Sequence, residues 1–378
     1  MAKDPVCGME VDGKQTPFNS DYKGHIHHFC TARCKASFER DPDKYLRLSE
    51  GSRIEERKIV VVGTGQVGSS FAFALMMSGL ADRIVLIDKD RELSEGHAMD
   101  LNHSMPFSQP AIVHAGDYRD CRDAGIVVIT AGVPQKPGES RLALARKNIA
   151  IFEEIVPRIA EQNPRILVVV ANPVDILTRA ALDLSGYPMN RVMGSGTILD
   201  TARFEYLMGQ HCGVDPRSVR AHVIGEHGDS EVAVWSQVNI GGVPLKDYCP
   251  VCERSCTPEE RTKLFDKVRQ AAYEVIEKKG ATYFAIALGL VRMCACILRD
   301  ERSVLTISTL LDDYYGVSGV CLSIPVVLGR NGILKLIRID LSEEEREAFV
   351  RSAETLTQAW SRIDSGGSHT ARLPAEGE

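Results

Sequence analysis

The sequence predicts an α/β fold with a doubly wound parallel sheet, followed by an α+β domain and preceded by a small module that contains cysteines. Two observations lead to this prediction. From Lys58 to about residue 200, short runs of β-branched residues alternate with segments of helix length, which is typical of a parallel sheet with helices on both faces. Beyond residue 200 long helical stretches and strand pairs dominate, which is typical of an α+β arrangement.

The expected strands of the parallel sheet are short and apolar, and each is followed by turn residues. They are Ile59–Val62, Ile84–Ile87, Ile112–His114, Ile126–Thr130 and Ile166–Val170. The expected helices between them are Val67–Ser78, Glu92–Ser104 and Arg141–Gln162.

In the second part, Thr257–Leu298 predicts a long helix with Gly280 near its middle, because a threonine cap is followed by glutamate at the third position. Ser303–Leu311 and Gly319–Leu328 predict antiparallel strands, and Ser342–Arg362 predicts a last amphipathic helix. The expected divisions are a module over 1–50, a charged linker over 51–57, domains over 58–199 and 200–364, and a disordered tail over 365–378.

Composition narrows the class of protein. The chain has 378 residues, 44% of them hydrophobic and 25% charged, which is enough for a large core and for two or three domains. A net charge of −6 gives no reason to expect nucleic acid or a membrane as partner. The N-terminus has no apolar stretch typical of a signal peptide, and Ala285–Leu298 is too short to span a bilayer. Eleven cysteines without a secretion signal favour a reducing compartment, so we expect a cytoplasmic protein.

A glycine-rich segment follows the first expected strand. Gly63, Gly65 and Gly68 have the spacing G-x-G-x-x-G, with Gln66 and Val67 between the last two. In a Rossmann fold such glycines allow a tight turn, close approach of a pyrophosphate, and close packing of helix on strand. Asp88 ends the next strand, 20 residues after Gly68, where an acid binds the ribose hydroxyls and repels a 2′-phosphate. We therefore expect NAD rather than NADP; a glycine-rich turn with no ligand is the alternative.

Four polar residues beyond this segment suit the reduction of a 2-oxo acid. His227 follows an apolar run in the segment Ile224–Asp229, and Asp200 and Arg203 are three residues apart, so they can share one helical face. Arg141 follows a loop rich in glycine and proline. The histidine would exchange a proton with the C2 oxygen and Asp200 would fix its tautomer. Arg203 would grip the substrate carboxylate, and Arg141 would polarise the ketone.

Several separate motifs over residues 57–363 together resemble the L-lactate dehydrogenases of the lactate/malate dehydrogenase superfamily. The motifs are Gly63–Gly68, Thr130–Gly132, Pro137–Arg141, Asn172–Asp175, Gly194–Thr197, Leu199–Arg203, Gly225–Asp229 and Lys279–Thr282. The resemblance implies reversible hydride transfer between NADH and pyruvate, a role in glycolysis or fermentation, and a homotetramer. It also implies that Asn172 contacts nicotinamide and substrate, and that Thr282 lines the substrate pocket. The plainer alternatives are a turn at Asn172 and a helix-interior position for Thr282.

Gln135 lies on the loop 132–138, which by resemblance closes over the substrate and brings Arg141 in. Malate dehydrogenases of the superfamily carry arginine at this position, which pairs with the second carboxylate of oxaloacetate. A neutral glutamine leaves that carboxylate unpaired, so Gln135 favours pyruvate and lactate. A malate or other 2-hydroxy-acid dehydrogenase remains the alternative, because the cation Lys136 is next to it.

The sequence departs from the family at an effector site. By resemblance, activation of bacterial members by fructose 1,6-bisphosphate uses an arginine two residues after the substrate arginine and a histidine seven before the catalytic one. This chain has Glu205 and Arg220 at those positions. Glu205 would repel a phosphate, whereas Arg220 could still attract one, and we expect weak or absent activation.

The first 50 residues resemble a YHS domain over residues 4–46, a type of domain that accompanies metal-handling proteins. Cys7, Cys30 and Cys34 supply three thiolates, and three thiolates suit Zn²⁺ or Cu(I). The candidates for a fourth ligand are His25, His27 and His28. The alternative is that the cysteines are free and half-buried. An alternative function of a different class is that the whole chain is a metal-handling protein that uses the dehydrogenase fold as a scaffold.

A second cysteine cluster comprises Cys249, Cys252 and Cys256. With no further ligand nearby in the sequence, ordinary thiols at a helix start are favoured over a metal or redox site.

Overall fold

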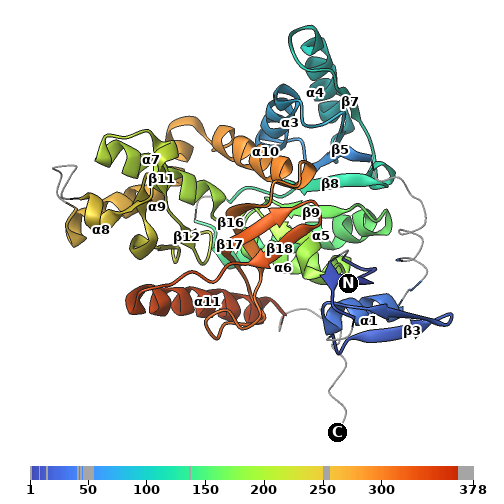
Figure 1. The fold of residues 1–378 in the computed structure, drawn as a ribbon. Helices are drawn as coiled ribbons and strands as arrows, with labels where there is room; N and C mark the ends of the chain where they lie inside the picture. The colour runs from blue at the N-terminus through green and yellow to red at the C-terminus, as the bar shows by residue number, and fades with distance from the viewer. Residues whose placement is uncertain are drawn as a thin grey trace.

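The computed structural model describes residues 2–7, 9–13, 16–40, 42, 45, 55–135, 138–249 and 256–364. A nine-stranded sheet forms its centre, in the order β18-β17-β16-β10-β9-β8-β5-β6-β7. The strands from β7 to β10 are parallel, whereas β16, β17 and β18 run antiparallel and extend the same sheet (Figure 1). The prediction of an α/β fold with a doubly wound parallel sheet is therefore confirmed.

The parallel strands are almost entirely buried, as short β-branched runs between helices should be. In β8 every residue is buried, and Ile59, Val60 and Val61 of β5 have no exposed surface. The strands are β5 (Glu55–Val62), β6 (Arg83–Ile87), β7 (Ile112–Ala115), β8 (Ala124–Ile129), β9 (Ile166–Val169) and β10 (Val192–Gly194). The helices between them are α3 (Gln66–Ser78), α4 (Arg91–His103), α5 (Arg141–Glu161) and α6 (Val174–Ser185).

The second part of the chain combines helices, small hairpins and the antiparallel strands. Its helices are α7 (Ile198–Cys212), α8 (Leu245–Tyr248), α9 (Pro258–Lys279), α10 (Phe284–Leu298) and α11 (Glu343–Asp364). Its long strands are β16 (Ser303–Leu310), β17 (Cys321–Gly329) and β18 (Gly332–Leu336). Its short strands are β11 (Val219–Arg220), β12 (Val223–Ile224), β13 (Val232–Ala233), β14 (Asn239–Ile240) and β15 (Val243–Pro244). Single-turn 3-10 helices cover Met105–Phe107, Tyr118–Cys121, Met189–Arg191, Pro216–Ser218 and Trp235–Gln237.

One predicted helix is wrong. Thr257–Leu298 forms two helices, because Gly280 adopts a left-handed conformation (φ 87°) and caps α9, its N–H donating to the carbonyl of Ile276. Thr282 therefore lies between α9 and α10 and not in a helix interior. The Thr257 cap itself is as expected, since its side chain accepts from the N–H of Glu260.

The N-terminal module has its own small core. It contains β1 (Ala2–Lys3), β2 (Glu10–Val11), β3 (Asn19–Tyr22), β4 (His25–His28) and α1 (Ala32–Arg40). Phe38 has no exposed surface and packs against Phe29, with ring centroids 5.1 Å apart. The module contacts the dehydrogenase part through Arg33, whose Nη2 lies 3.4 Å from the carbonyl of Leu182 at the end of α6. Figure 1 shows the module below the sheet, near α6.

None of the described helices has the length and apolar composition needed to cross a membrane. The expected disordered tail, residues 365–378, lies outside the described residues.

Candidate active site

The glycine-rich turn joins β5 to α3 at the carboxyl end of the parallel sheet. Gly63 has φ 98°, and a Cβ there would lie 2.5 Å from the amide nitrogen of Ala131. A Cβ on Gly68 would lie 1.9 Å from the carbonyl oxygen of Gly63, so only glycine permits this packing of helix on strand. A Cβ on Gly65 would meet nothing within 4 Å. Gly65 thus leaves open space before the N-terminus of α3, where Gln66 and Val67 form the first turn, and this fits a pyrophosphate.

Asp88 lies directly after β6 and faces the same turn. One of its oxygens accepts from the amide of Thr64 at 2.6 Å and from the Thr64 hydroxyl at 3.1 Å. A carboxylate has about four lone-pair sites, so the bonded side chain keeps acceptor capacity for ribose hydroxyls. The arrangement fits a dinucleotide with an unphosphorylated ribose.

The hairpin of β12 and β13 carries His227 at its tip. Ile224 pairs with Val232, and the loop between them is fixed where the His227 N–H donates to Asp175 at 2.8 Å. Asp175, in the first turn of α6, also accepts from the Ser308 hydroxyl at 2.6 Å. Burial raises the pKa of Asp175 to about 6 despite these two hydrogen bonds. The hairpin and α6 together determine where the imidazole lies.

His227, Asp200 and Arg203 form one connected group. The imidazole Nδ1 lies 2.6 Å from Oδ2 of Asp200, and Nη1 of Arg203 lies 2.8 Å from Oδ1 of the same carboxylate. Burial lowers the pKa of His227, but the Asp200 charge outweighs this and raises it to about 9. Burial likewise opposes ionisation of Asp200, yet its two cationic partners hold its pKa below the usual value. The group thus stabilises a protonated imidazole beside an ionised carboxylate.

Arg141 is the first residue of α5 and lines the same cavity as His227, Asp200 and Arg203. Its Nη1 lies 2.9 Å from Oε1 of Glu226, and its Nη2 lies 3.2 Å from Oδ2 of Asp229. Its side chain is 40% exposed, so a substrate could compete for the guanidinium. Gln135 also lies here, and its Nε2 donates to the carbonyl of Glu139 at 2.7 Å. Lys136 lies outside the described residues.

One cavity of about 170 Å³ brings most of the predicted residues together. It is lined by predicted residues Gln135, Arg141, Asn172, Asp200, Arg203 and His227. Thr282 is not among its lining residues. Residues that the sequence analysis does not single out also line it, including Glu231 just before β13, and Arg269 and Tyr273 of α9. The sequence gives no signal that these residues face a substrate. Arg269 and Tyr273 are far from His227 along the chain, and Glu231 looks like an ordinary polar loop residue.

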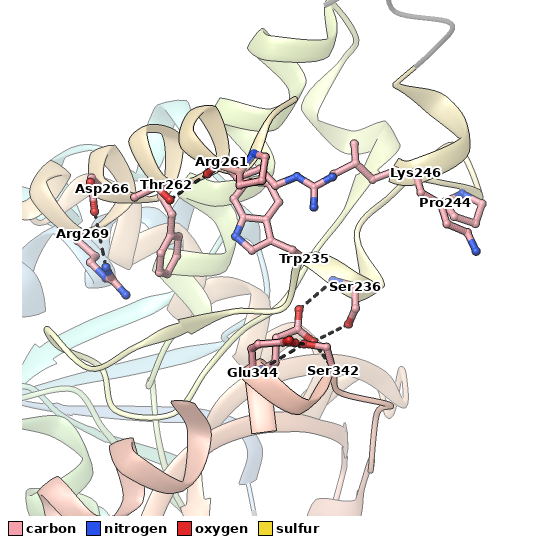
Figure 2. A pocket seen from close by; sticks show the side chains of 14 residues that line it. Trp235, Ser236, Pro244, Lys246, Arg261, Thr262, Asp266, Arg269, Ser342 and Glu344 are labelled. Atoms are coloured by element: carbon pink, nitrogen blue, oxygen red, sulfur yellow. Dashed lines mark hydrogen bonds and ion pairs between the residues drawn. The ribbon is translucent and has the colours of Figure 1, made fainter. Parts of the chain in front are cut away.

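A larger cavity of about 1030 Å³ lies between α9, α8 and the start of α11, and it contains none of the predicted site residues. Figure 2 shows Arg261 beside Trp235 on one wall. On another wall Glu345 accepts from the amide of Ser236 at 2.9 Å and from its hydroxyl at 2.6 Å. Arg269 lines both cavities, so α9 forms a wall that they share.

The three predicted thiols of the module lie together. The Sγ atoms of Cys7 and Cys30 are 3.5 Å apart, and those of Cys30 and Cys34 are 3.7 Å apart. Asp4 is the fourth member of this group of possible ligands, and none of the three candidate histidines belongs to it. Asp4 accepts from the amides of Val6 and Cys30, both at 2.8 Å, so it also ties the two cysteine loops together. Cys7 and Cys34 are buried rather than half-buried.

Cys249 and Cys256 are partly buried, and Cys252 lies outside the described residues.

The fold and the site together define a class: an α/β dehydrogenase with a glycine-rich turn for a dinucleotide at the carboxyl end of a parallel sheet and a histidine–aspartate pair in a cavity. Two family descriptions match the chain: "lactate/malate dehydrogenase, NAD binding domain" over residues 57–194, and "lactate/malate dehydrogenase, alpha/beta C-terminal domain" over 197–365. The chain therefore belongs to the lactate/malate dehydrogenase family and is an NAD-dependent oxidoreductase. A YHS domain matches residues 2–49.

Curated relatives agree over most of the chain. An L-lactate dehydrogenase of Thermoanaerobacter sp. is 48% identical over 308 residues, covering 81% of this chain and 99% of the relative. An L-lactate dehydrogenase of Geobacillus kaustophilus is 52% identical over 301 residues, covering 79% and 95%. Among solved structures, a minor L-lactate dehydrogenase of Enterococcus mundtii in the ligand-bound form has a TM-score of 0.79 at 40% identity, covering 81% of this chain and 98% of that one.

Proposed function

We propose that the protein is an NAD-dependent L-lactate dehydrogenase that interconverts pyruvate and lactate. The single observation that supports this best is the cavity in which His227, paired with Asp200 at 2.6 Å, lies with Arg203 and Arg141. A histidine between an acid and two guanidiniums can exchange a proton with an oxygen while a carboxylate is held nearby.

In pyruvate reduction, NADH supplies the hydride to C2 when it is bound. His227 gives the proton of its Nε2 to the C2 oxygen and takes it back in lactate oxidation. Asp200 accepts from Nδ1, which fixes the tautomer and stabilises the imidazolium. Because the pKa of His227 is raised to about 9, the proton donor is present at neutral pH and is lost as the pH rises through this value.

The two arginines have separate roles. Arg203 would bind the substrate carboxylate in a bidentate pair while it keeps Asp200 ionised. Arg141 would leave Glu226 and Asp229 and face the C2 oxygen as negative charge develops there. Asn172 would orient nicotinamide and substrate from the cavity wall. The resemblance gives Thr282 a place in the substrate pocket, whereas in this structure Thr282 is not among the residues that line the cavity.

The open space at Gly65 and the carboxylate of Asp88 support NAD as cofactor, because a second negative charge from a 2′-phosphate would be repelled by Asp88. Gly63, Gly68, Gln66 and Val67 shape the turn that would hold the pyrophosphate. In this assignment residues 58–199 form the NAD-binding domain and 200–364 the substrate domain, with the boundary falling inside α7.

Gln135 supports pyruvate over oxaloacetate, because it lines the cavity and carries no charge. The test is a steady-state comparison of the two oxo acids with NADH. We expect a higher kcat/KM for pyruvate, and a preference for oxaloacetate would make the protein a malate dehydrogenase instead.

An exposed apolar surface supports self-association as a homotetramer. Phe73 and Met77 of α3 are each 51% exposed, and Phe284 and Leu288 of α10 are 66% and 65% exposed. The two helices lie side by side (Figure 1), so the four side chains lie on neighbouring helices and suit a partner subunit. The expected mass in light scattering is four chains; a monomer at micromolar concentration would contradict the proposal. We place this assembly in the cytoplasm.

We also propose that the module binds Zn²⁺ or Cu(I) through Cys7, Cys30 and Cys34. Thiol hydrogen bonds from Cys34 and Cys7 lower the pKa of Cys30, which suits a metal-binding thiolate. Metal analysis of the full chain after equilibration with each metal tests this beside a Cys30→Ser, Cys34→Ser double variant. We expect one metal ion in the first and none in the second; equal contents would defeat the proposal.

A further inference from the structure

Glu231 is a buried acid in the active-site cavity that the mechanism above does not use. It lies four residues after His227, and only 3% of its surface is exposed. Its Oε1 is buried and has no hydrogen-bond partner among the described residues. A buried oxygen without a partner is costly for a carboxylate and much less so for a neutral acid.

The backbone holds Glu231 where it is. Its N–H donates to the carbonyl of Gly228 at 3.2 Å, and its carbonyl accepts from Nη2 of Arg269 at 3.1 Å. The next residue begins β13, whose pairing with β12 closes the His227 loop. A carboxylate oxygen of Glu231, one of Asp200 and a ring nitrogen of His227 all lie within 4.8 Å of one another. The carboxyl group of Glu231 therefore shares a desolvated space with the proton carrier.

Charged groups from several elements face this space. They are Asp200 and Arg203 of α7, Arg269 of α9, Arg141 of α5, and His227 and Asp229 of the same loop. Two further acids contact these lining residues: Asp175 accepts from the His227 amide, and Glu226 pairs with Arg141. The cations are bound to other acids: Arg203 and His227 to Asp200, Arg141 to Glu226 and Asp229, and Arg269 to Asp266 at 3.6 Å. No ion pair to Glu231 occurs within the described part of the chain.

Two carboxyl groups in one cavity with too few cations do not both ionise. Asp200 keeps its charge because two cationic groups contact it directly. Burial, and after it the charge of Asp200, raises the pKa of Glu231 to about 8. At neutral pH the proton is therefore on Glu231.

We propose that Glu231 is a second proton-bearing group of the active site, which admits the 2-oxo acid anion as a neutral acid and repels it as a carboxylate. The proposal rests on the proposed function, because it assigns a role toward the substrate of that reaction. Binding of pyruvate would then require two protons, one on His227 and one on Glu231. Two unit charges about 6 Å apart at an effective dielectric of about 20 weaken binding by about 100-fold, which sets the size of the effect.

The test is the pH dependence of kcat/KM for pyruvate at saturating NADH. Above about pH 9 we expect the wild-type value to fall with a slope that approaches 100-fold per pH unit, because two protons are lost. Glu231→Gln, a neutral isostere, should fall only about tenfold per unit.

Two variants serve as controls. Glu277→Gln removes an exposed acid of α9 and should keep the two-proton profile. Glu231→Asp keeps an ionisable carboxyl group, so its kcat/KM should still depend on the loss of two protons. A purely structural role of Glu231 would not require this profile. An equal proton number in wild type and Glu231→Gln, with NADH binding intact in both, would overturn the inference. Failure of the wild-type protein to reduce pyruvate at any pH would instead overturn the proposed function itself, and this inference with it.

Discussion

At the scale of single residues, the site depends on how Asp200 divides its carboxylate between two cations. One oxygen contacts His227 and the other contacts Arg203, so in the proposed mechanism one buried charge serves both proton transfer and substrate binding. A buried carboxylate with two such partners costs less to desolvate than an isolated one. This pairing also explains why the imidazole remains protonated although burial alone would lower its pKa.

Asp200→Asn should remove that support. The pKa of His227 would fall from about 9 toward or below its reference value, because burial then acts without a compensating charge. We expect kcat/KM for pyruvate at pH 7 to fall by about 100-fold or more, and its alkaline limb to move to lower pH. Steady-state kinetics between pH 5.5 and about 9.5 would measure both. An unchanged alkaline limb would show that Asp200 does not control the proton donor.

Gln135→Arg should shift the substrate preference toward oxaloacetate. The new guanidinium would pair with the second carboxylate, so we expect the ratio of kcat/KM for oxaloacetate to that for pyruvate to rise by about a thousandfold, equivalent to roughly 4 kcal/mol. Gln135→Met is the matched control, since it loses the bond to Glu139 without adding charge. A similar shift in both variants would contradict the charge argument.

The site residues differ in how far the sequence predicts them. Gly63, Gly65 and Gly68 are predictable because their spacing is typical of a turn that binds a dinucleotide. His227 is predictable because its surroundings match a known motif. Glu231 is not predictable, because before Val232 it looks like any polar loop residue. Only packing of α7 and α9 around the loop buries it. In the same way, the sequence around Asp4 indicates only a turn. The structure shows that its carboxylate accepts backbone N–H groups from both cysteine loops.

At the scale of elements, the sequence predicts most accurately those helices whose first turn has a side-chain cap. Helices α4, α5 and α9 begin at Asp90, Ser140 and Thr257, whose side chains accept backbone N–H groups, and their N-terminal ends agree with prediction within a residue. Helix α6 begins after Pro173 without a side-chain cap, so the sequence indicates only a turn there. Strand β18 is likewise not predicted, since it is short and its register against β17 shifts between Val327 and Leu328.

The junction of β5 and α3 should tolerate no side chain at Gly68. In Gly68→Ala the new methyl would meet the carbonyl of Gly63 at 1.9 Å, so the helix must move away from the strand. We expect about 1–3 kcal/mol of lost stability and at least tenfold weaker NADH binding. Thermal unfolding and fluorescence titration would measure these effects. Gly96→Ala in α4, where a Cβ meets nothing within 4 Å, is the control and should leave both unchanged or raise stability slightly.

At the scale of the whole molecule, the chain joins a dehydrogenase to a small cysteine-containing module that contacts the end of α6. The start of the same helix holds the His227 loop through Asp175. The sequence predicts both parts separately, but contact between them depends on side chains such as Arg33 whose partner is a backbone carbonyl far along the chain. No sequence pattern encodes such a contact.

Control of the whole enzyme by a phosphorylated effector should be weak. Glu205 accepts from the amide of Ala221, and burial raises its pKa to about 7, so a fraction of it is charged at neutral pH and repels phosphate. Arg220 is exposed and its guanidinium donates to the carbonyls of Arg217 and Val219. We expect fructose 1,6-bisphosphate to change KM for pyruvate by less than about twofold. A large decrease in KM at pH 7 would contradict this, and Glu205→Gln would show whether the acid limits the response.

The central claim is that His227 carries the proton of a pyruvate reduction. The most direct measurement is kcat/KM for pyruvate with NADH in His227→Asn beside wild type, with NADH affinity measured in both. We predict a loss of about 10³-fold or more in kcat/KM with NADH affinity unchanged, since the asparagine has no proton to give. A variant that reduces pyruvate within about tenfold of wild type would contradict the account.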